Sequence, residues 1–158
     1  ASLALLGAGE SSDAWHISAP HPDGVGAEAA MQMALAQAGI APDQVGYINL
    51  HGTATRLNDA MESQAVHRLF GDKVPCSSTK PLTGHTLGAA GAIEAALACL
   101  LLERALPLPP QRVTTTDPAL ALIRLVSGAT RLAAPRVLSN SFAFGGNNVS
   151  LLFGRSPS

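Results

Sequence analysis

Short apolar segments alternate along this chain with longer, Ala-rich segments, and this alternation constrains the fold more than any other feature. Three early apolar runs predict strands, over residues 2–6, 45–50 and 74–77. Three longer segments predict helices, over residues 27–38, 58–70 and 84–104. Three later runs predict strands, over residues 122–126, 136–142 and 149–153, the last two as an antiparallel pair. The order predicts an α/β domain whose mixed, mostly parallel sheet has helices on both faces.

Glycines and capping residues set the expected boundaries of these elements. Gly7 and Gly9 are expected to end the first strand, which leaves residues 10–24 as a loop long enough to be functional. Asn58 or Asp59 is expected to cap the second helix. The third helix is apolar on nearly all sides, so we expect it to be buried on nearly all sides.

Composition narrows the class of protein. A length of 158 residues suits one domain, and 47% hydrophobic with 13% charged residues exclude intrinsic disorder. A formal net charge of −1 provides no basic field for nucleic acid or a membrane surface. Cys76 and Cys99 are too few for a secreted disulfide framework, so the cytoplasm is the expected compartment. Glu94, near the middle of apolar residues 86–102, favours a core helix over a membrane span.

Two histidines follow the ends of successive predicted strands. His51 begins the segment His-Gly-Thr-Ala-Thr after one strand, and His85 ends the segment Ser-Thr-Lys-Pro-Leu-Thr-Gly-His after the next. Open α/β sheets place their sites at the carboxyl ends of strands, so two imidazoles that converge there indicate a chemical role. Taken alone, His51 fits a ligand-binding loop and a carbonyl-capping histidine equally well.

Charged groups in apolar surroundings need partners. Lys80 lies beside a largely apolar helix, and Glu62 on the preceding helix is its expected carboxylate partner. A purely structural ion pair is the alternative. Glu94 lies within the apolar helix and must be paired, protonated or bound to a cation. Nine residues beyond His85, it is not expected to lie beside that histidine.

A Gly-rich segment, Phe-Ala-Phe-Gly-Gly-Asn-Asn over residues 142–148, is expected at the tip of the last hairpin. Glycines beside aromatic residues can hold an unusual backbone and aim amides into a cavity. An ordinary hairpin turn is the simpler interpretation.

Together these segments resemble the C-terminal half of the β-ketoacyl-acyl carrier protein synthases, the elongating condensing enzymes of fatty-acid and polyketide synthesis. Four motifs carry the resemblance in family order, at residues 11–16, 51–55, 78–91 and 140–146. The resemblance implies a thiolase-type fold of two similar α/β halves, usually dimerised, of which residues 1–158 would be the second. A chain that starts without Met and directly in a strand fits a segment of a longer protein.

The resemblance also implies a Cys-His-His catalytic triad. The cysteine would belong to the first half, and His51 and His85 to this chain, which is therefore expected to be inactive alone. Malonyl-acyl carrier protein would lose carbon dioxide, and two imidazole N–H groups would hold the resulting enolate while it attacks an acyl group on the cysteine. Lys80, paired with Glu62, would orient the histidine loop. No cofactor and no catalytic metal ion are expected.

Further residues match family positions for substrate binding. The backbone N–H of Phe144 would form part of an oxyanion hole, and its side chain would gate the acyl pocket. Thr53 and Thr55 would bind the pantetheine arm of the substrate. Phe142 and Gly145 would belong to the same binding site. In some relatives a buried monovalent cation lies near the positions of Asn49, Glu94 and Ser139.

Three residues depart from the family pattern. Ala143 and Asn58 stand where glycine is common, and Asn147 stands where threonine is common. A hinge that needs positive φ would be strained at Ala143. The change at Asn58 is mild, because Asn tolerates a left-handed backbone. These departures bear on the mobility of the gate and on acyl-chain preference rather than on the histidines.

The expected partners are an acyl carrier protein, the first half of the same enzyme and a second copy of the full-length protein. One alternative is a non-catalytic partner of a condensing enzyme, such as a chain-length-determining subunit or a scaffold, although an inert subunit has no need of His51, Lys80 and His85. Another is a metal hydrolase that uses the two histidines. The chain offers that alternative no compact ligand pair such as His-Glu-x-x-His.

Overall fold

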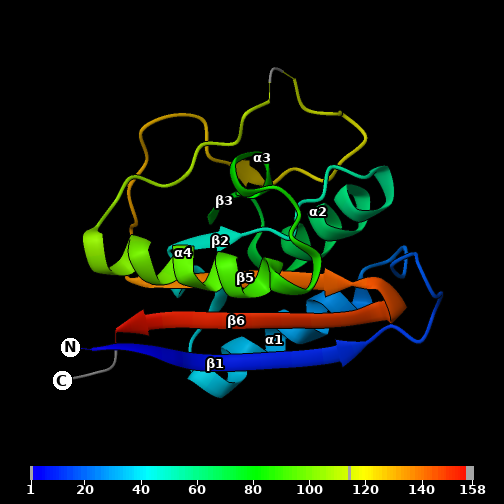
Figure 1. The fold of residues 1–158 in the computed structure, drawn as a ribbon, viewed down its shortest axis with the longest axis horizontal. Helices are drawn as coiled ribbons and strands as arrows, with labels where there is room; N and C mark the ends of the chain where they lie inside the picture. Colours follow the sequence, from blue (N-terminus) through cyan, green and yellow to red (C-terminus); the bar gives the residue numbers. More distant parts are fainter. Residues whose placement is uncertain (1, 114, 156–158) are drawn as a thin grey trace.

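Six strands form one sheet in the computed structural model, which describes residues 2–113 and 115–155 (Figure 1). The strands are β1 (Leu3–Ser12), β2 (Tyr47–Asn49), β3 (Pro75–Ser77), β4 (Arg124–Leu125), β5 (Arg136–Ala143) and β6 (Asn147–Arg155). They lie in the order β1-β6-β5-β2-β3-β4. β2 is parallel to β3 and β5, and β3 to β4, whereas β6 is antiparallel to β1 and β5. The α/β class, the mixed sheet and the closing antiparallel pair are thus confirmed.

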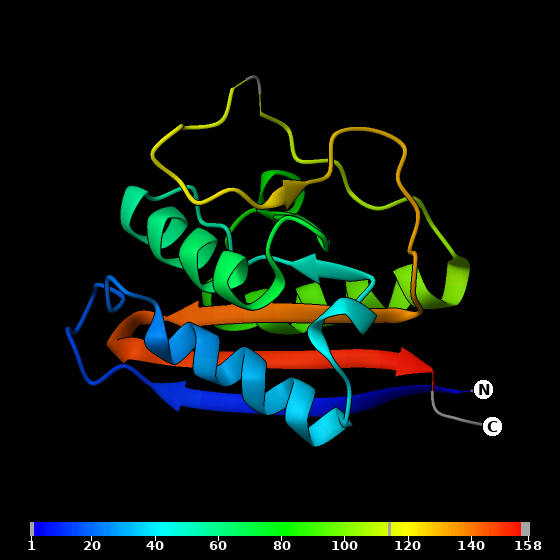
Figure 2. The same ribbon diagram turned by 180° about the vertical axis from the view of Figure 1, so that it is seen from behind.

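Helices cover both faces of this sheet. They are α1 (Val25–Ala38), α2 (Arg56–Phe70), the single turn α3 (Lys80–Thr83) and α4 (Ala90–Arg104), with 3-10 turns at Pro42–Gln44, Leu87–Ala89 and Phe144–Gly146. α4 lies in front of the sheet in Figure 1, and α1 and α2 lie in front of it in the reverse view of Figure 2. No helix among the described residues is long and apolar enough to cross a membrane.

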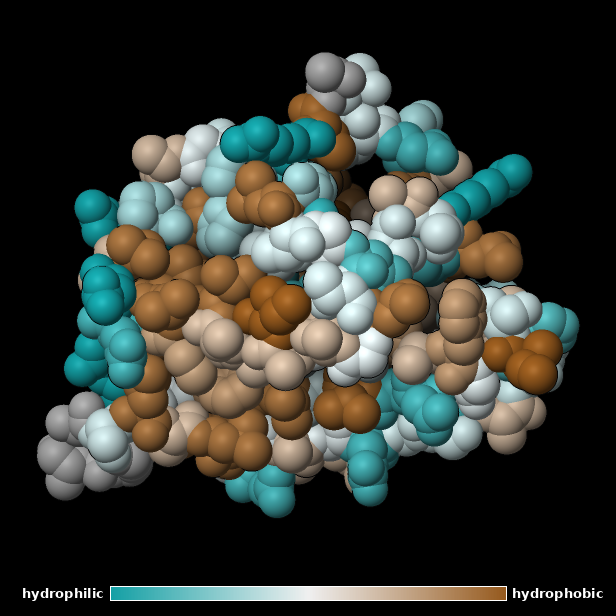
Figure 3. Space-filling model, in the orientation of Figure 1, coloured by the Kyte–Doolittle hydropathy of each residue, from teal (hydrophilic) through white to brown (hydrophobic). Residues whose placement is uncertain are grey.

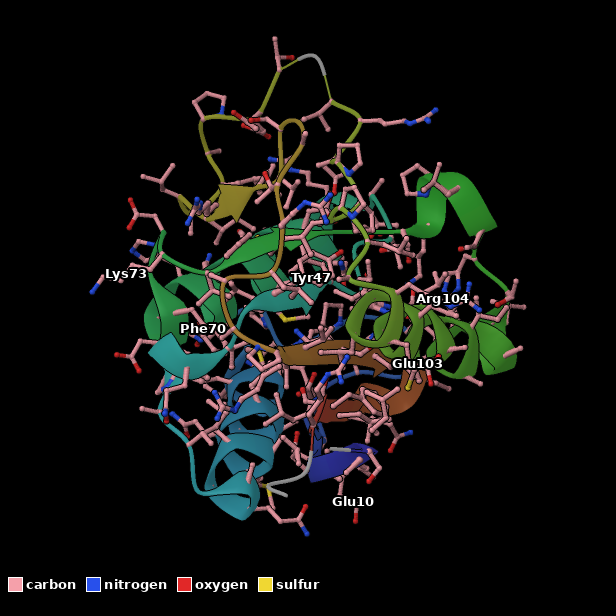
Figure 4. The ribbon with its side chains drawn as sticks, turned by 90° about the vertical axis from the view of Figure 1, so that its left-hand side faces the viewer. Glu10, Tyr47, Phe70, Lys73, Glu103 and Arg104 are labelled. Atoms are coloured by element: carbon pink, nitrogen blue, oxygen red, sulfur yellow. The ribbon has the colours of Figure 1, made fainter. Side chains whose placement is uncertain are left out.

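Each face of the sheet has its own apolar core. Met31, Ile48 and Phe70 belong to the cluster between the sheet and α1 with α2. Tyr47 and Leu101 belong to the cluster beneath α4. Figure 4 views the sheet nearly along its strands, with Phe70 in the layer of α2 and Tyr47 between this layer and α4. The residues at the ends of the strands therefore lie between the two apolar clusters, one on each face of the sheet.

The first strand is longer than predicted, because Gly7 and Gly9 lie within it instead of ending it. β1 continues to Ser12, and α1 packs directly on it. A Cβ atom at Gly7 would collide with the backbone carbonyl of Ala34, and one at Gly9 with that of Ala30. The glycines thus permit a close approach of helix to strand, and the loop is shortened to residues 13–24.

The predicted helix over residues 84–104 is also wrong in its start, and the described residues bury only one side of it. α4 begins at Ala90, after Gly84 (φ 75°) and a 3-10 turn. Its inner face is buried, whereas Ala92, Ala96 and Leu100 are exposed. Figure 3 shows an apolar surface over α4 and the strands below it. The helix is therefore covered on one side only by the described residues of this chain.

Candidate functional site

His51 and His85 come together where β2 and β3 end. Their ring centroids are 5.6 Å apart, and the rings meet edge to face at 86°. Phe142, near the end of β5, lies with its ring centroid 5.9 Å from that of His51. The expected convergence of the two imidazoles beside the aromatic hairpin is therefore present, from three segments that are distant in the sequence.

Glu62 holds the backbone of the loop that carries His51. Its carboxylate, buried in α2, accepts the backbone N–H of His51 at 2.7 Å and that of Gly52 at 2.8 Å. The amide of Asn58 donates to it at 3.3 Å. Burial raises the pKa of Glu62, and these three hydrogen bonds oppose the rise. Donors at both oxygens suit the ionised form.

The predicted pairing of Lys80 with Glu62 is wrong, because Lys80 pairs with Glu94. The distance from Lys80 Nζ to Glu94 Oε1 is 2.5 Å, and both side chains are buried. Burial raises the pKa of Glu94, and the ammonium of Lys80 opposes the rise. The buried carboxylate of α4 thus has its counter-charge, and this ion pair joins α3 to α4.

Burial and the nearby ammonium keep His51 neutral. Lys80 Nζ lies 3.5 Å from His51 Nδ1. Burial first, then the charge of Lys80 and the proximity of His85, lower the pKa of His51 from 6.5 to about 3. Because an ammonium can only donate, Nδ1 is the acceptor and the ring proton lies on Nε2.

The backbone gives His85 the same tautomer. Its Nδ1 accepts the backbone N–H of Leu87 at 3.3 Å, so its proton also lies on Nε2. Leu87 has φ 51°, in the left-handed region of backbone conformation that few residues other than glycine adopt. Such backbone strain is concentrated at functional sites. Each ring therefore presents an Nε2–H group that donates to no other described residue.

A cleft of about 610 Å³ lies against both imidazoles. Four segments line it, within residues 13–20, 51–58, 85–91 and 141–148. Thr53, Thr55, Phe142 and Phe144 belong to its lining, as do the two histidines. Phe144 is 75% exposed at the hairpin tip. Residues of every motif in the resemblance therefore meet at one cleft.

Three predicted site residues have other contacts. The Thr53 and Thr55 hydroxyls lie 3.1 Å apart. Thr55 also caps α2 by accepting the backbone N–H of Asn58, so the predicted capping by Asn58 or Asp59 is wrong. Gly145 does not line the cleft, and its N–H donates to the carbonyl of Ile17 at 2.8 Å.

Asp13, to which the residues alone assigned no role, joins the hairpin tip to the loop over residues 13–24. Its backbone N–H donates to the Gly146 carbonyl at 2.8 Å. Its carboxylate accepts the backbone N–H of His21 at 2.9 Å and the Asn148 amide at 2.8 Å. Local sequence carries no signal for this link, because 135 residues separate Asp13 from Asn148.

Two departures from the family pattern cause no strain in this conformation. Ala143 has an extended backbone, with φ −109° and ψ 163°. Asn58 lies in the first turn of α2, where its amide donates to Glu62. The expected positive φ is therefore absent at both positions.

The described residues hold no group of three or more His, Cys, Asp or Glu side chains that could bind a metal ion. Glu94 Oε2 is buried and has no hydrogen-bond partner within the described chain. It therefore fits a ligand of the monovalent cation that the resemblance places near Asn49 and Ser139. At another of these positions, Asn49 Oδ1 accepts a long hydrogen bond of 3.5 Å from the Thr79 hydroxyl.

Residues 3–114 match the family model described as β-ketoacyl synthase, C-terminal domain. The chain belongs to the β-ketoacyl synthase family. It is 40% identical over 154 residues to 3-oxoacyl-[acyl-carrier-protein] synthase 2 of Coxiella burnetii, a match that covers 96% of this chain and 37% of that relative. The chain thus spans well under half of the curated β-ketoacyl synthase that it matches.

Solved structures confirm the thiolase-type fold. A chain of a ketosynthase in complex with its chain length factor, from Xenorhabdus doucetiae, matches with TM-score 0.96 and 62% identity over 98% of this chain and 39% of its own. A type II polyketide synthase acyl-carrier protein in complex with its ketosynthase gives TM-score 0.88 and 30% identity, over 97% of this chain and 38% of the matched one. The β-ketoacyl synthase C-terminal domain is thus supported by sequence and by structure.

Proposed function

We propose that the full-length protein is a β-ketoacyl-acyl carrier protein synthase, to which this chain contributes the two catalytic histidines. The proposal depends on one observation above all. His51 and His85 lie with ring centroids 5.6 Å apart, each with its proton on Nε2, against an open cleft. Two neutral donors so close together suit a single oxygen atom on which negative charge develops.

The reaction would have two parts. An acyl group first passes from a carrier thioester to a cysteine thiol of the first half, and the carrier thiol leaves. Malonyl-acyl carrier protein then loses carbon dioxide, and the electrons of the broken C–C bond form an enolate. His51 and His85 donate from Nε2 to the enolate oxygen. The enolate carbon attacks the acyl-cysteine carbonyl, and the cysteine thiolate leaves with the β-ketoacyl product still on the carrier.

Neighbouring groups would keep the histidines in their working state. Lys80, balanced by Glu94, donates to His51 Nδ1 and disfavours protonation of that ring. Glu62 fixes the backbone on which His51 stands. Glu62 therefore acts through the loop backbone, and Lys80 acts through the ring.

The cleft and hairpin would bind the substrate. Phe142 packs beside His51, and the Thr53 and Thr55 hydroxyls at the lining suit a pantetheine arm. The backbone N–H of Phe144 would complete an oxyanion hole during acyl transfer, and its exposed ring would gate the acyl pocket. Gly145 would act through the backbone of the tip, since it does not line the cleft.

The proposed partners are an acyl carrier protein, the first half and a second full-length copy. Solved relatives include a ketosynthase with its chain length factor and one with an acyl-carrier protein. The first half must supply the nucleophile, because neither cysteine here suits the role. Cys76 is buried in β3, and burial raises the pKa of its thiol to about 12. Burial also raises the pKa of Cys99 on α4.

Substitution of His85 in the full-length protein tests the proposal. We expect His85→Ala to abolish release of carbon dioxide from malonyl-acyl carrier protein while part of the cysteine acylation, followed by mass spectrometry, persists. His67→Ala, a change at an exposed histidine of α2, serves as the matched control. Equal loss of both steps in His85→Ala would contradict the role given to His85.

The isolated chain gives an independent test. It should form no acyl-enzyme when mixed with an acyl thioester, since the nucleophile is proposed to lie elsewhere. Mass spectrometry that found an acyl group on Cys76 or Cys99 would overturn this part of the proposal.

A non-catalytic chain-length subunit is the second candidate, because one matched structure contains a ketosynthase together with its chain length factor. The two candidates differ in a single assay. A catalytic subunit releases carbon dioxide from malonyl-acyl carrier protein, and a non-catalytic partner does not. The retained histidine pair favours the first. The cytoplasmic location of the protein and the homodimer of its full-length form remain predictions.

A further inference from the structure

Arg56 is the fixed positive charge of the cleft. Among its described lining residues, the other ionisable side chains are Asp13, His51 and His85. Both Asp13 oxygens already accept hydrogen bonds. His51 is neutral, and His85 accepts a backbone N–H at Nδ1, which only a neutral ring can do. An incoming anion would therefore find its counter-charge in the cleft at Arg56.

No contact of the Arg56 side chain with the described residues explains why an arginine stands at this position. Arg56 is exposed, and its side chain forms no hydrogen bond or ion pair with another described residue. Five other arginines each donate to a described acceptor, namely Arg68, Arg124, Arg131, Arg136 and Arg155. Arg56 is also the first residue of α2, where the helix dipole disfavours a cation. Arg104 and Arg112 also lack a partner among the described residues, so it is the place of Arg56 in the lining of the cleft that suggests a ligand.

The segment from His51 to Arg56 leads from the interior to the surface. His51 is buried, Thr53 is half-buried, and Thr55 and Arg56 are exposed. All four line the same cleft. A long, thin ligand that reaches the imidazoles would therefore pass the two threonines and leave the cleft beside the guanidinium.

We propose that Arg56 binds the phosphate of the phosphopantetheine arm that delivers the thioester. This inference rests on the proposed function, which places the thioester at His51 and His85. The phosphate is at the opposite end of pantetheine from the sulfur, and so reaches the outer end of this path. A planar guanidinium donates two parallel N–H bonds to a phosphate and remains charged at all physiological pH values.

The phosphate has two possible sources, a carrier protein and coenzyme A. Substrates that differ only in this part of the molecule separate them. Malonyl-acyl carrier protein and malonyl-coenzyme A both carry the phosphate, whereas malonyl-pantetheine lacks it. A contact of Arg56 with the carrier surface instead would affect the carrier substrate alone.

The test compares these three substrates in the full-length protein and its Arg56→Gln and Arg56→Lys variants. We expect Arg56→Gln to raise KM roughly tenfold for both phosphate-containing substrates, the effect of losing one charge-assisted hydrogen-bond pair. kcat, and all constants for malonyl-pantetheine, should not change. Arg56→Lys should restore part of the affinity. Arg104→Gln, at the far end of α4 (Figure 4), is the matched control.

Several results would overturn the inference. One is an equal rise in the KM of Arg56→Gln for malonyl-pantetheine, and another is no rise in KM for any substrate. A third is a rise in KM for malonyl-acyl carrier protein alone, which would assign Arg56 to the carrier surface. Equilibrium binding of free phosphopantetheine and of pantetheine separates this inference from the proposed function. If the protein releases no carbon dioxide, the proposed function fails, while a tenfold weaker binding of phosphopantetheine alone to Arg56→Gln still supports the phosphate contact.

Discussion

At the scale of single residues, the charge of His51 is set by its surroundings. The ring is 7% exposed and lies beside the ammonium of Lys80. Both factors oppose a positive charge on the imidazole, and burial has the larger effect. His51 can therefore act as a hydrogen-bond donor over a wide range of pH without becoming an acid.

This state links stability to pH. The pKa of His51 is about 3 in the folded protein and near 6.5 when the ring is free. As pH falls from 6.5 towards 3, the unfolded chain takes up the proton and the folded chain does not. The free energy of unfolding then falls by at most about 1.4 kcal/mol per pH unit from this group.

Urea unfolding of His51→Gln and of the unmodified chain at pH 7 and pH 5 measures the effect. The stability advantage of the unmodified chain should shrink at pH 5, because the variant lacks this titration. His16→Gln, at an exposed histidine, controls for general effects of losing an imidazole. A stability difference that is the same at both pH values would refute the linkage.

The choice of partner for Lys80 is also testable at this scale. Lys80→Met and Glu94→Gln should couple strongly in a double-mutant cycle, by an energy on the order of 1–3 kcal/mol, because the two charges meet at 2.5 Å. Lys80→Met and Glu62→Gln should couple much less, since Glu62 bonds to backbone amides. Unfolding free energies of the single and double variants give both values. The reverse ranking would contradict the pairing described above.

At the scale of elements, close contact between β1 and α1 decides the length of the first strand. Gly7 and Gly9 face the helix backbone so closely that no side chain fits. The same glycines, viewed only along the sequence, resemble a strand end. Their role depends on contacts with Ala34 and Ala30, which lie more than 20 residues further along the chain.

Gly9→Ala should therefore destabilise the protein by about 1–3 kcal/mol, the usual cost of overpacking. Gly88→Ala is the matched control, because a Cβ atom there would meet nothing within 4 Å. Thermal unfolding followed by circular dichroism measures both. Equal melting temperatures for the two variants would mean that β1 and α1 can move apart at little cost.

The limits of sequence-based prediction follow from the same dependence on distant contacts. His51 and His85 were predictable as neighbours, because the ends of adjacent parallel strands share one edge of a sheet. Glu62 and Glu94 were not distinguishable as partners of Lys80, since both are buried carboxylates on helices that flank the site. The start of α4 depends on the left-handed backbone at Gly84 and Leu87, which local composition does not specify.

At the scale of the whole molecule, one face of α4 remains apolar and uncovered by the described residues. Ala92, Ala96 and Leu100 are exposed there, and Figure 3 shows an apolar surface over α4. Surfaces of this kind mark interfaces. Because the chain spans 37% of the Coxiella relative, we expect the remainder of the full-length protein to cover this face.

The isolated chain should consequently self-associate. Leu100→Lys should shift it towards the monomer in analytical ultracentrifugation, because a buried ammonium is costly at such an interface. Met33→Lys, at an exposed methionine of α1 on the opposite face of the sheet, should leave the association unchanged. If Met33→Lys weakened the self-association and Leu100→Lys did not, the self-associating surface would lie on α1 instead.

The two hydrogen bonds from successive backbone amides to Glu62 affect the free energy of ligand binding. One carboxylate accepts the N–H groups of two successive peptide planes, the one that joins Leu50 to His51 and the one that joins His51 to Gly52. Rotation of either plane would break one charge-assisted hydrogen bond to a buried carboxylate. The imidazole thus keeps its orientation when no ligand is bound, so a ligand that binds beside it need not use binding free energy to orient it.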